Sequence, residues 1–172
     1  MFRTATAADI DRISEIYEEI HTEEEAGRSV IGWVRGVYPV RRTAELAVER
    51  GEMFVEEVDG VIVAAAKINQ VQEACYRQGR WRCEAADHEV MVLHTLVVSP
   101  AAKDCGYGTA FVDFYESYAR KHGCKVLRMD TNAKNAAARA LYKRLGYREA
   151  DIVPTVFNGI PGVQLVLLEK KL

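Results

Sequence analysis

Two glycines one residue apart, Gly106 and Gly108, follow an apolar run and precede a helix-like pattern, and a turn of this kind can bind phosphate. Glycine lets the backbone turn tightly and leaves no Cβ between a ligand and the amides. The first amides of a helix have no internal acceptors and lie at the positive end of the helix dipole, so they attract anions. The alternative is a turn that uses glycine only for its geometry. Gly-x-Gly alone does not decide between the two.

The longer phosphate-binding motifs are incomplete in this chain. The dinucleotide fingerprint Gly-x-Gly-x-x-Gly fails because Phe111 stands where the third glycine belongs. The phosphate loop of nucleoside triphosphatases fails because no Gly-Lys-Ser/Thr occurs. A nucleotide-binding protein of either of these kinds is therefore disfavoured.

A second segment downstream has its own helical signature. It opens on Asn135, which is a good N-cap residue, and closes on Gly146, where a helix C-terminus is expected. Between them, four side chains share one apolar helix face: Ala138, Leu141, Tyr142 and Leu145.

Together the two segments resemble the GNAT superfamily of acetyl-CoA-dependent N-acetyltransferases. The first is similar to that family's Gln/Arg-x-x-Gly-x-Gly/Ala pyrophosphate loop after a Leu-x-Val-x-Pro strand, here residues 96–100 and 103–108. The second is similar to its Asn-x-x-Ala-x-x-Leu-Tyr-x-x-x-Gly-Phe/Tyr segment, here residues 135–147. The departures are Lys103 in place of Gln or Arg, and Cys105 where a basic residue is frequent. Both departures leave the backbone amides of the loop available, and they affect only how strongly phosphate is bound.

The resemblance implies acetyl-CoA as co-substrate. Its pyrophosphate would lie on the amides of residues 103–109, and its pantetheine arm along the edge of the strand at residues 96–98. The implied cofactor-binding residues are Leu96, Val97, Val98, Lys103, Asp104, Cys105, Gly106, Tyr107, Gly108, Thr109, Asn135, Ala138 and Tyr142.

Acetyl transfer to an amine also needs a proton donor for the departing thiolate and a proton acceptor for the amine. Tyr142 is the expected donor, because the family places its tyrosine there and a phenol has a pKa of ~10. His94 and Glu89 are the candidate bases, and a water relay is the third option. Each also has a structural interpretation: Tyr142 and His94 as core residues, Glu89 as a surface charge.

The elements that position these residues alternate between strand and helix. Strands are predicted at residues 2–4, 53–58, 61–69, 90–98, 125–129, 147–153 and 163–169. Helices are predicted from Ile10 to about His21, from the cap Thr43 to Arg50, from Thr109 to about Gly123, and after Asn135. We expect one α/β domain over residues 1–172 with a GNAT-like fold, in which helices flank a mixed central sheet of six to seven strands.

Four segments carry specific expectations. Asp59-Gly60 between two apolar runs predicts a tight hairpin turn, and residues 130–132 are interpreted as a turn. Residues 70–87 show no period and are either a loop near the acceptor or a surface excursion anchored by Trp81. The acidic run at residues 23–25 is either a solvated helix end or an attraction for a cationic substrate.

Composition restricts the partners. The chain has 172 residues, 49% hydrophobic and 28% charged, and a net charge of -2 gives no sign of a nucleic-acid partner. No apolar run approaches the ~20 residues of a membrane span, no signal sequence is evident, and a cytoplasmic location is expected. The four cysteines and four histidines lack metal-site spacing, so no metal is expected. A homodimer through the apolar carboxyl-terminal strand stays open.

The predicted function is an N-acetyltransferase that moves the acetyl group of acetyl-CoA to an amine of a small molecule or peptide, by direct attack in a ternary complex. A non-catalytic acyl-CoA-binding sensor or interaction module is the alternative. Such a sensor would need the pyrophosphate loop but neither Tyr142 nor His94.

Overall fold

The hairpin at Asp59-Gly60 forms as predicted and sets the register of one half of the sheet. Strands β2 (Met53–Val58) and β3 (Val61–Asn69) flank a two-residue turn. Both turn residues have positive φ, 51° at Asp59 and 77° at Gly60, which is the conformation that Asp-Gly adopts readily.

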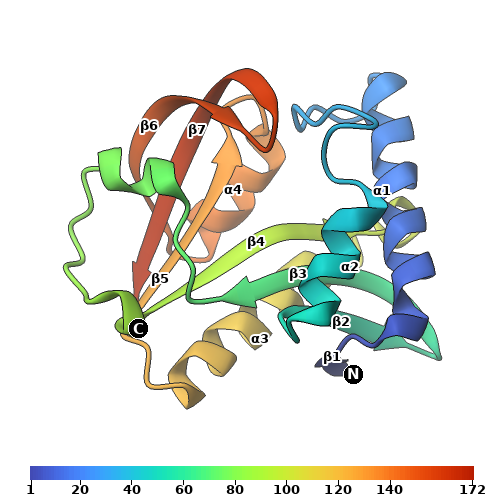
Figure 1. The fold of residues 1–172 in the computed structure, drawn as a ribbon, viewed down its shortest axis with the longest axis horizontal. Helices are drawn as coiled ribbons and strands as arrows, with labels where there is room; N and C mark the ends of the chain where they lie inside the picture. The colour runs from blue at the N-terminus through green and yellow to red at the C-terminus, as the bar shows by residue number, and fades with distance from the viewer.

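The computed structural model describes residues 1–172, and its strands form one seven-stranded mixed sheet in the order β1-β2-β3-β4-β5-β7-β6 (Figure 1). The remaining strands are β1 (Phe2–Thr4), β4 (Val90–Val98), β5 (Val126–Asn132), β6 (Arg148–Phe157) and β7 (Ile160–Lys171). Only β4 and β5 run parallel to each other. The predicted α/β class and strand number are confirmed.

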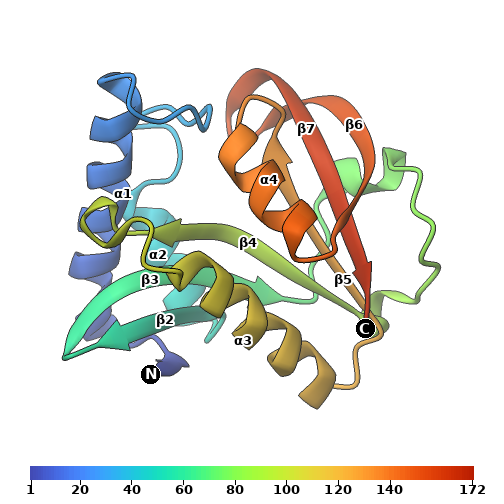
Figure 2. The same ribbon diagram turned by 180° about the vertical axis from the view of Figure 1, so that it is seen from behind.

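Helices cover both faces of the sheet. Helices α1 (Ile10–Glu25) and α2 (Arg41–Glu49) lie on one face, and α3 (Tyr107–Lys121) and α4 (Ala136–Arg144) on the other (Figures 1 and 2). The apolar stripe of α1 packs with α2 against β2 and β3, around the fully buried Ile13 and Ile16. On the opposite face Phe111 and Tyr115 of α3 are fully buried in the largest core cluster. None of the helices has both the length and the apolar character that crossing a membrane requires.

The two central parallel strands separate partway along their length. Their ladder runs from Val90↔Val126 to Leu93↔Met129 and then stops. Beyond it β4 pairs only with β3, and β5 only with β7. The register of β4 also shifts at Thr95, whose φ is 53°, so a bulge bends the strand where the opening begins. The sheet therefore opens between β4 and β5, in the region where both strands end.

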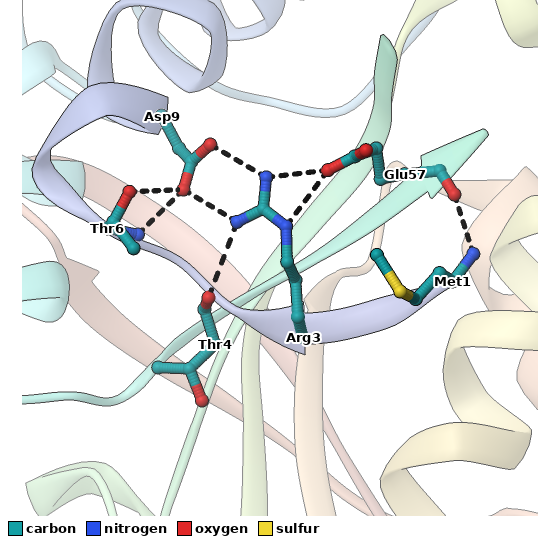
Figure 3. A network of polar contacts seen from close by, with 6 residues as sticks. All are labelled: Met1, Arg3, Thr4, Thr6, Asp9 and Glu57. Atoms are coloured by element: carbon teal, nitrogen blue, oxygen red, sulfur yellow. Dashed lines mark hydrogen bonds and ion pairs between the residues drawn. The ribbon is translucent and has the colours of Figure 1, made fainter. Parts of the chain in front are cut away.

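A polar network ties the first strand to the start of α1 (Figure 3). The Arg3 guanidinium donates to both carboxylate oxygens of Asp9, at 2.7 and 2.9 Å, and to Glu57 of β2. The backbone N–H of Thr6 donates to the same Asp9, which is one half of a capping box. The hydrogen bonds from Arg3 hold the pKa of Asp9 well below its usual range.

Three boundaries differ from the predictions. Helix α1 continues to Glu25, so the acidic run is its last turn. Helix α2 starts at Arg41, and Thr43 lies in its first turn, where its hydroxyl accepts from the N–H of Val40. Residues 130–132 were expected to form a turn and are strand, because they pair with β7.

The carboxyl-terminal strands also differ from the predictions. β6 and β7 are longer than predicted and meet at a two-residue turn, Asn158-Gly159. The carboxyl-terminal strand β7 lies between β5 and β6, so its backbone is not free to pair with a second copy.

Candidate active site

The opening between β4 and β5 contains a cavity of about 980 Å3. Its walls come from the ends of both strands, the loop before α3, the exposed side of α4 and the loop after α1. Because this cavity lies at the carboxyl ends of parallel strands beside a helix N-terminus, its position suits an anionic ligand.

The loop before α3 presents a row of free amides to the cavity. Gly106 is the N-cap of α3 in a left-handed conformation, with φ 84°, which glycine adopts without strain. The backbone N–H groups of residues 104–106 donate no hydrogen bond within the protein, and those of residues 107–109 lie in the first helical turn without helical acceptors. A Cβ on Gly106 would meet no protein atom within 4 Å, so the space in front of it is open.

Helices α3 and α4 pack closely at the second glycine. A Cβ on Gly108 would lie 3.4 Å from Cδ2 of Leu141, so glycine lets α4 approach the phosphate loop. Asn135 caps α4 as predicted, since its side chain accepts from the N–H of Ala138 at 3.1 Å. This packing brings the two segments noticed in the sequence onto one cavity.

Most of the predicted cofactor residues line this cavity. They are Leu96, Val97, Val98, Lys103, Asp104, Gly106, Tyr107, Gly108, Thr109, Asn135, Ala138 and Tyr142. Cys105 does not line it: its thiol is exposed and lies 3.6 Å from the carbonyl oxygen of Lys103.

Tyr142 projects from α4 into the cavity. Its side chain is buried, with 7% of the residue exposed, yet its hydroxyl makes no hydrogen bond within the protein. Burial raises the pKa of this phenol, and the charge of Asp130 raises it further. The phenol therefore stays protonated over the physiological range and has a free O–H to donate.

His94 lies at the inner end of the cavity with both ring nitrogens engaged. Nε2 is 2.9 Å from Oδ1 of Asn69, and Nδ1 is 3.3 Å from Oε1 of Glu73. Oδ1 of Asn69 also accepts from the N–H of Val71, which fixes this atom as the amide oxygen. Both histidine nitrogens thus face oxygen atoms of neighbouring side chains, and the contact with His94 lowers the pKa of the Glu73 carboxyl. Burial lowers the pKa of His94, and the hydrogen bond to Glu73 opposes that effect.

Glu89 lies outside the cavity, at the start of β4. It forms an ion pair with Lys125, and this contact lowers the pKa of its carboxyl. Its surroundings are those of a surface charge.

Two carboxylates in the cavity were missed by sequence analysis. Asp130, on β5, lines the cavity and accepts a hydrogen bond of 2.7 Å from the hydroxyl of Tyr76. Glu73, in the connection after β3, lines it beside His94. The same connection is anchored by Trp81, whose Nε1 donates to the carbonyl of Tyr76 at 2.7 Å. Residues 70–87 thus contribute Glu73 to the cavity and are anchored at Trp81.

The acidic run at the end of α1 builds a cavity wall. Glu24 accepts hydrogen bonds from the backbone N–H groups of Ile31, Gly32 and Trp33, at 2.5 to 3.3 Å. All three of those residues line the cavity. Glu24 is therefore occupied in holding the loop, and its carboxylate is not free to attract a substrate.

The chain matches known proteins in sequence and in fold. Residues 10–147 match the model of the acetyltransferase (GNAT) family. An uncharacterized N-acetyltransferase of Methanocaldococcus jannaschii is 32% identical over 73 residues, which are 42% of this chain. The match spans about a third, 32%, of that relative's length.

Two solved structures show the same fold. A GNAT-family acetyltransferase from Streptococcus agalactiae 2603 has a TM-score of 0.81 at 22% identity, covering 100% of this chain and 95% of the other. An acetyltransferase from Salmonella typhimurium, solved with its cofactor acetyl-CoA, has a TM-score of 0.68 at 21% identity, covering 99% of this chain and 92% of the other.

Proposed function

Because the chain belongs to the acetyltransferase (GNAT) family, we propose that it transfers the acetyl group of acetyl-CoA to the amine of a small molecule or peptide, by direct attack in a ternary complex. The observation that carries this proposal is the free phenol of Tyr142. It faces the same cavity as Asp104 and residues 106–109, whose backbone amides have no partner within the protein. A protein that only sensed acyl-CoA would need the amides but not the phenol.

The residues present fit acetyl-CoA. The row of free amides around Gly106 supplies donors for a diphosphate, and the open space in front of that glycine leaves room for it. The Lys103 ammonium adds a positive charge to the same wall. The edge of β4 that faces away from β3 has no strand partner beyond Leu93, so its backbone groups are available to a pantetheine arm.

Bound acetyl-CoA supplies a thioester carbonyl as the acetyl donor. The chain's own groups would act around it in three ways. Backbone N–H groups on the free edge of β4 stabilise negative charge on the carbonyl oxygen, a contribution of ~3 kcal/mol per donor. Tyr142 donates its proton to the departing sulfur. His94, in this proposal, acts together with Glu73 rather than alone, because neither of its nitrogens is free to accept a proton directly.

Incubation of the purified protein with acetyl-CoA and a panel of amines tests the proposal, with thiol release and the mass of the product as readouts. We expect thiol release that depends on the amine and an acetylated product. Tyr142→Phe should bind acetyl-CoA and release thiol much more slowly. Tight binding of acetyl-CoA without transfer to any amine would instead favour the sensor.

A further inference from the structure

The bulge in β4 is centred on a residue with an unusual backbone conformation. Thr95 has a φ of 53°, in the left-handed region. The other non-glycine residues with a positive φ are Asp59, Asp104 and Asn158, and aspartate and asparagine enter this region several-fold more often than most residues. A β-branched residue such as threonine is rare there, because its backbone is strained. The surroundings of Thr95 must therefore hold it in this conformation.

The side chain of Thr95 makes one hydrogen bond, and its partner is the hydroxyl of Tyr38. Tyr38 lies at the end of the loop between α1 and α2, which Glu24 holds through the backbone N–H groups of residues 31–33. The rings of Tyr38 and Trp33 pack edge to face, with their centroids 6.1 Å apart. Removal from water raises the pKa of Tyr38, so its hydroxyl keeps its proton at neutral pH. The loop is thus tied to β4 at the bulge.

The same bulge sets the direction of one backbone amide at the open edge of the sheet. The N–H of Ser99 donates to the carbonyl of Val63 on β3 at 2.8 Å. Because N–H directions alternate along a strand, the N–H of Leu96, three positions earlier, is directed away from β3. On that side β4 has no strand partner at this point, and Leu96 lines the cavity. The peptide group that carries this N–H is bonded to the Cα of Thr95, so the conformation of Thr95 decides where the N–H points.

We infer that Tyr38 is a positioning residue for acetyl transfer: its hydrogen bond to Thr95 keeps the bulge left-handed and so directs the Leu96 N–H at the carbonyl oxygen of bound acetyl-CoA. This inference rests on the proposed function, in which N–H groups of this edge stabilise that oxygen. Tyr38 itself touches no reacting atom and moves no proton. Without the bond, Thr95 relaxes to the extended conformation that threonine prefers, and the N–H turns away from the carbonyl.

The two ends of the hydrogen bond separate this role from a direct contact with the acceptor. Tyr38 lines the cavity, so Tyr38→Phe also removes a phenol that faces any bound acceptor. Thr95→Val removes the hydroxyl at the other end of the bond and leaves the phenol in place. A positioning role predicts that the two variants have the same effect, and that the double variant is no worse than either single one. An effect of Tyr38→Phe that Thr95→Val does not reproduce would overturn the inference.

The first measurement needs no ligand. Backbone carbon-13 chemical shifts distinguish a left-handed residue from an extended one, so they report the conformation of Thr95 in solution. We expect left-handed values in the wild type and extended values in Tyr38→Phe. Tyr17→Phe is the matched control, because Tyr17 is fully buried on α1 and its hydroxyl makes no hydrogen bond within the protein. Thr95 shifts that are the same in Tyr38→Phe and in the wild type would overturn the inference.

The second measurement is the resonance of the thioester carbonyl, with acetyl-CoA labelled with carbon-13 at that atom. A hydrogen bond from an N–H polarises the carbonyl and moves its resonance downfield. We expect this shift in the wild type and in Tyr17→Phe. In Tyr38→Phe and Thr95→Val the resonance should return toward that of free acetyl-CoA, while the dissociation constant stays within a few-fold. If the bond served only to hold the loop, Tyr38→Phe would keep the downfield resonance, and the inference would fail.

A rescue tests whether the backbone conformation is what matters. Asparagine and glycine enter the left-handed region readily, so at position 95 neither needs the bond to Tyr38. Hydroxylamine is a small amine that is unprotonated at neutral pH, and thiol release at saturating acetyl-CoA measures its acetylation. Tyr38→Phe should slow this release by ~10-fold or more, because a misdirected N–H no longer stabilises the oxyanion. Tyr38→Phe/Thr95→Asn should recover most of the rate and the downfield resonance. No recovery in this variant or in Tyr38→Phe/Thr95→Gly would overturn the inference.

Failure of this inference and failure of the proposed function give different results. If acetyl-CoA binds with a downfield carbonyl that depends on Tyr38, but no amine is acetylated, the proposed function fails and the positioning role stands. If amines are acetylated and the carbonyl resonance is the same in Tyr38→Phe as in the wild type, the proposed function stands and the positioning role fails. If acetyl-CoA does not bind, both fail.

Discussion

Asp130→Asn should stabilise the protein relative to the wild type at alkaline pH. The folded state raises the pKa of this carboxyl from an ordinary value of 3.8 to about 7. A raised pKa in the folded state means that the folded protein holds its proton more tightly than the unfolded chain does. The stability gained from that proton is full below pH 3.8 and is lost as the pH rises through about 7.

The size of the effect follows from the same two values. At ~1.36 kcal/mol for each pH unit, the full difference is ~4 kcal/mol. About 2.5 kcal/mol of it should be lost between about pH 5 and pH 8. Asparagine does not titrate, so its free energy of unfolding should lack this component.

Urea denaturation of wild type and Asp130→Asn at those two pH values measures the difference directly. The free energy of unfolding of the variant, relative to that of the wild type, should increase by ~2.5 kcal/mol from about pH 5 to about pH 8. Asp113→Asn removes an exposed carboxylate and serves as the control, with no such gain. An equal difference between Asp130→Asn and wild type at both pH values would refute the reasoning, because the carboxyl would then titrate normally.

Three further outcomes follow from the cavity. Tyr142→Phe should lower kcat by ~100-fold or more and leave the dissociation constant of acetyl-CoA within a few-fold, measured by steady-state kinetics and calorimetry. Gly106→Ala should weaken acetyl-CoA binding, because the residue has φ 84° and its Cβ would enter the open space before the amides. Gly123→Ala is the control, because Gly123 also has a positive φ, 73°, and open space around it. This variant carries a similar backbone strain and should bind acetyl-CoA as the wild type does. Glu89→Gln should leave both kcat/KM and its pH profile unchanged, since Glu89 pairs with Lys125 outside the cavity. Loss of the acid-side inflection in this variant would instead support Glu89 as the general base.

The phosphate loop could be predicted from sequence because its determinants are local. A left-handed N-cap at Gly106 and close helix packing at Gly108 are both properties of single glycines. The capped helix after Asn135 is equally local. These segments also carry the family motifs, so the part of the cavity formed by the phosphate loop and α4 could be predicted from residue types and spacing.

The part of the cavity that contains Asp130 and Glu73 could not be predicted, because these residues are placed by tertiary contacts. Asp130 begins an Asp-Thr-Asn sequence that favours a turn, and pairing with β7 overrides that local preference. Glu73 lies in a connection without periodicity, which is fixed by the buried Tyr76 and by the stacking of Arg128 over Trp81, 4.1 Å from the ring centroid. No spacing in the chain relates residue 73 to residue 130.

His94 shows a different limit of sequence reasoning. Its intrinsic pKa made it a natural base, but Asn69 and Glu73 occupy both of its nitrogens. The pKa of a side chain type says nothing of which of its atoms remain free. Here the hydrogen bond of Val71 to Asn69 settles the orientation of the amide, and with it the role left to the imidazole.

Tyr142 and Asp130 are electrostatically coupled across the cavity, and this coupling can be measured. The negative charge of Asp130 is one reason why the pKa of Tyr142 is raised. Protonation of Asp130 removes that charge, so the phenol then becomes a stronger acid. Two groups that act in one sequence should not lose activity independently. We therefore expect the double variant Asp130→Asn/Tyr142→Phe to lose less activity than the product of the two single losses, measured as kcat at saturating amine. Strictly multiplicative losses would show that the two side chains act on separate events.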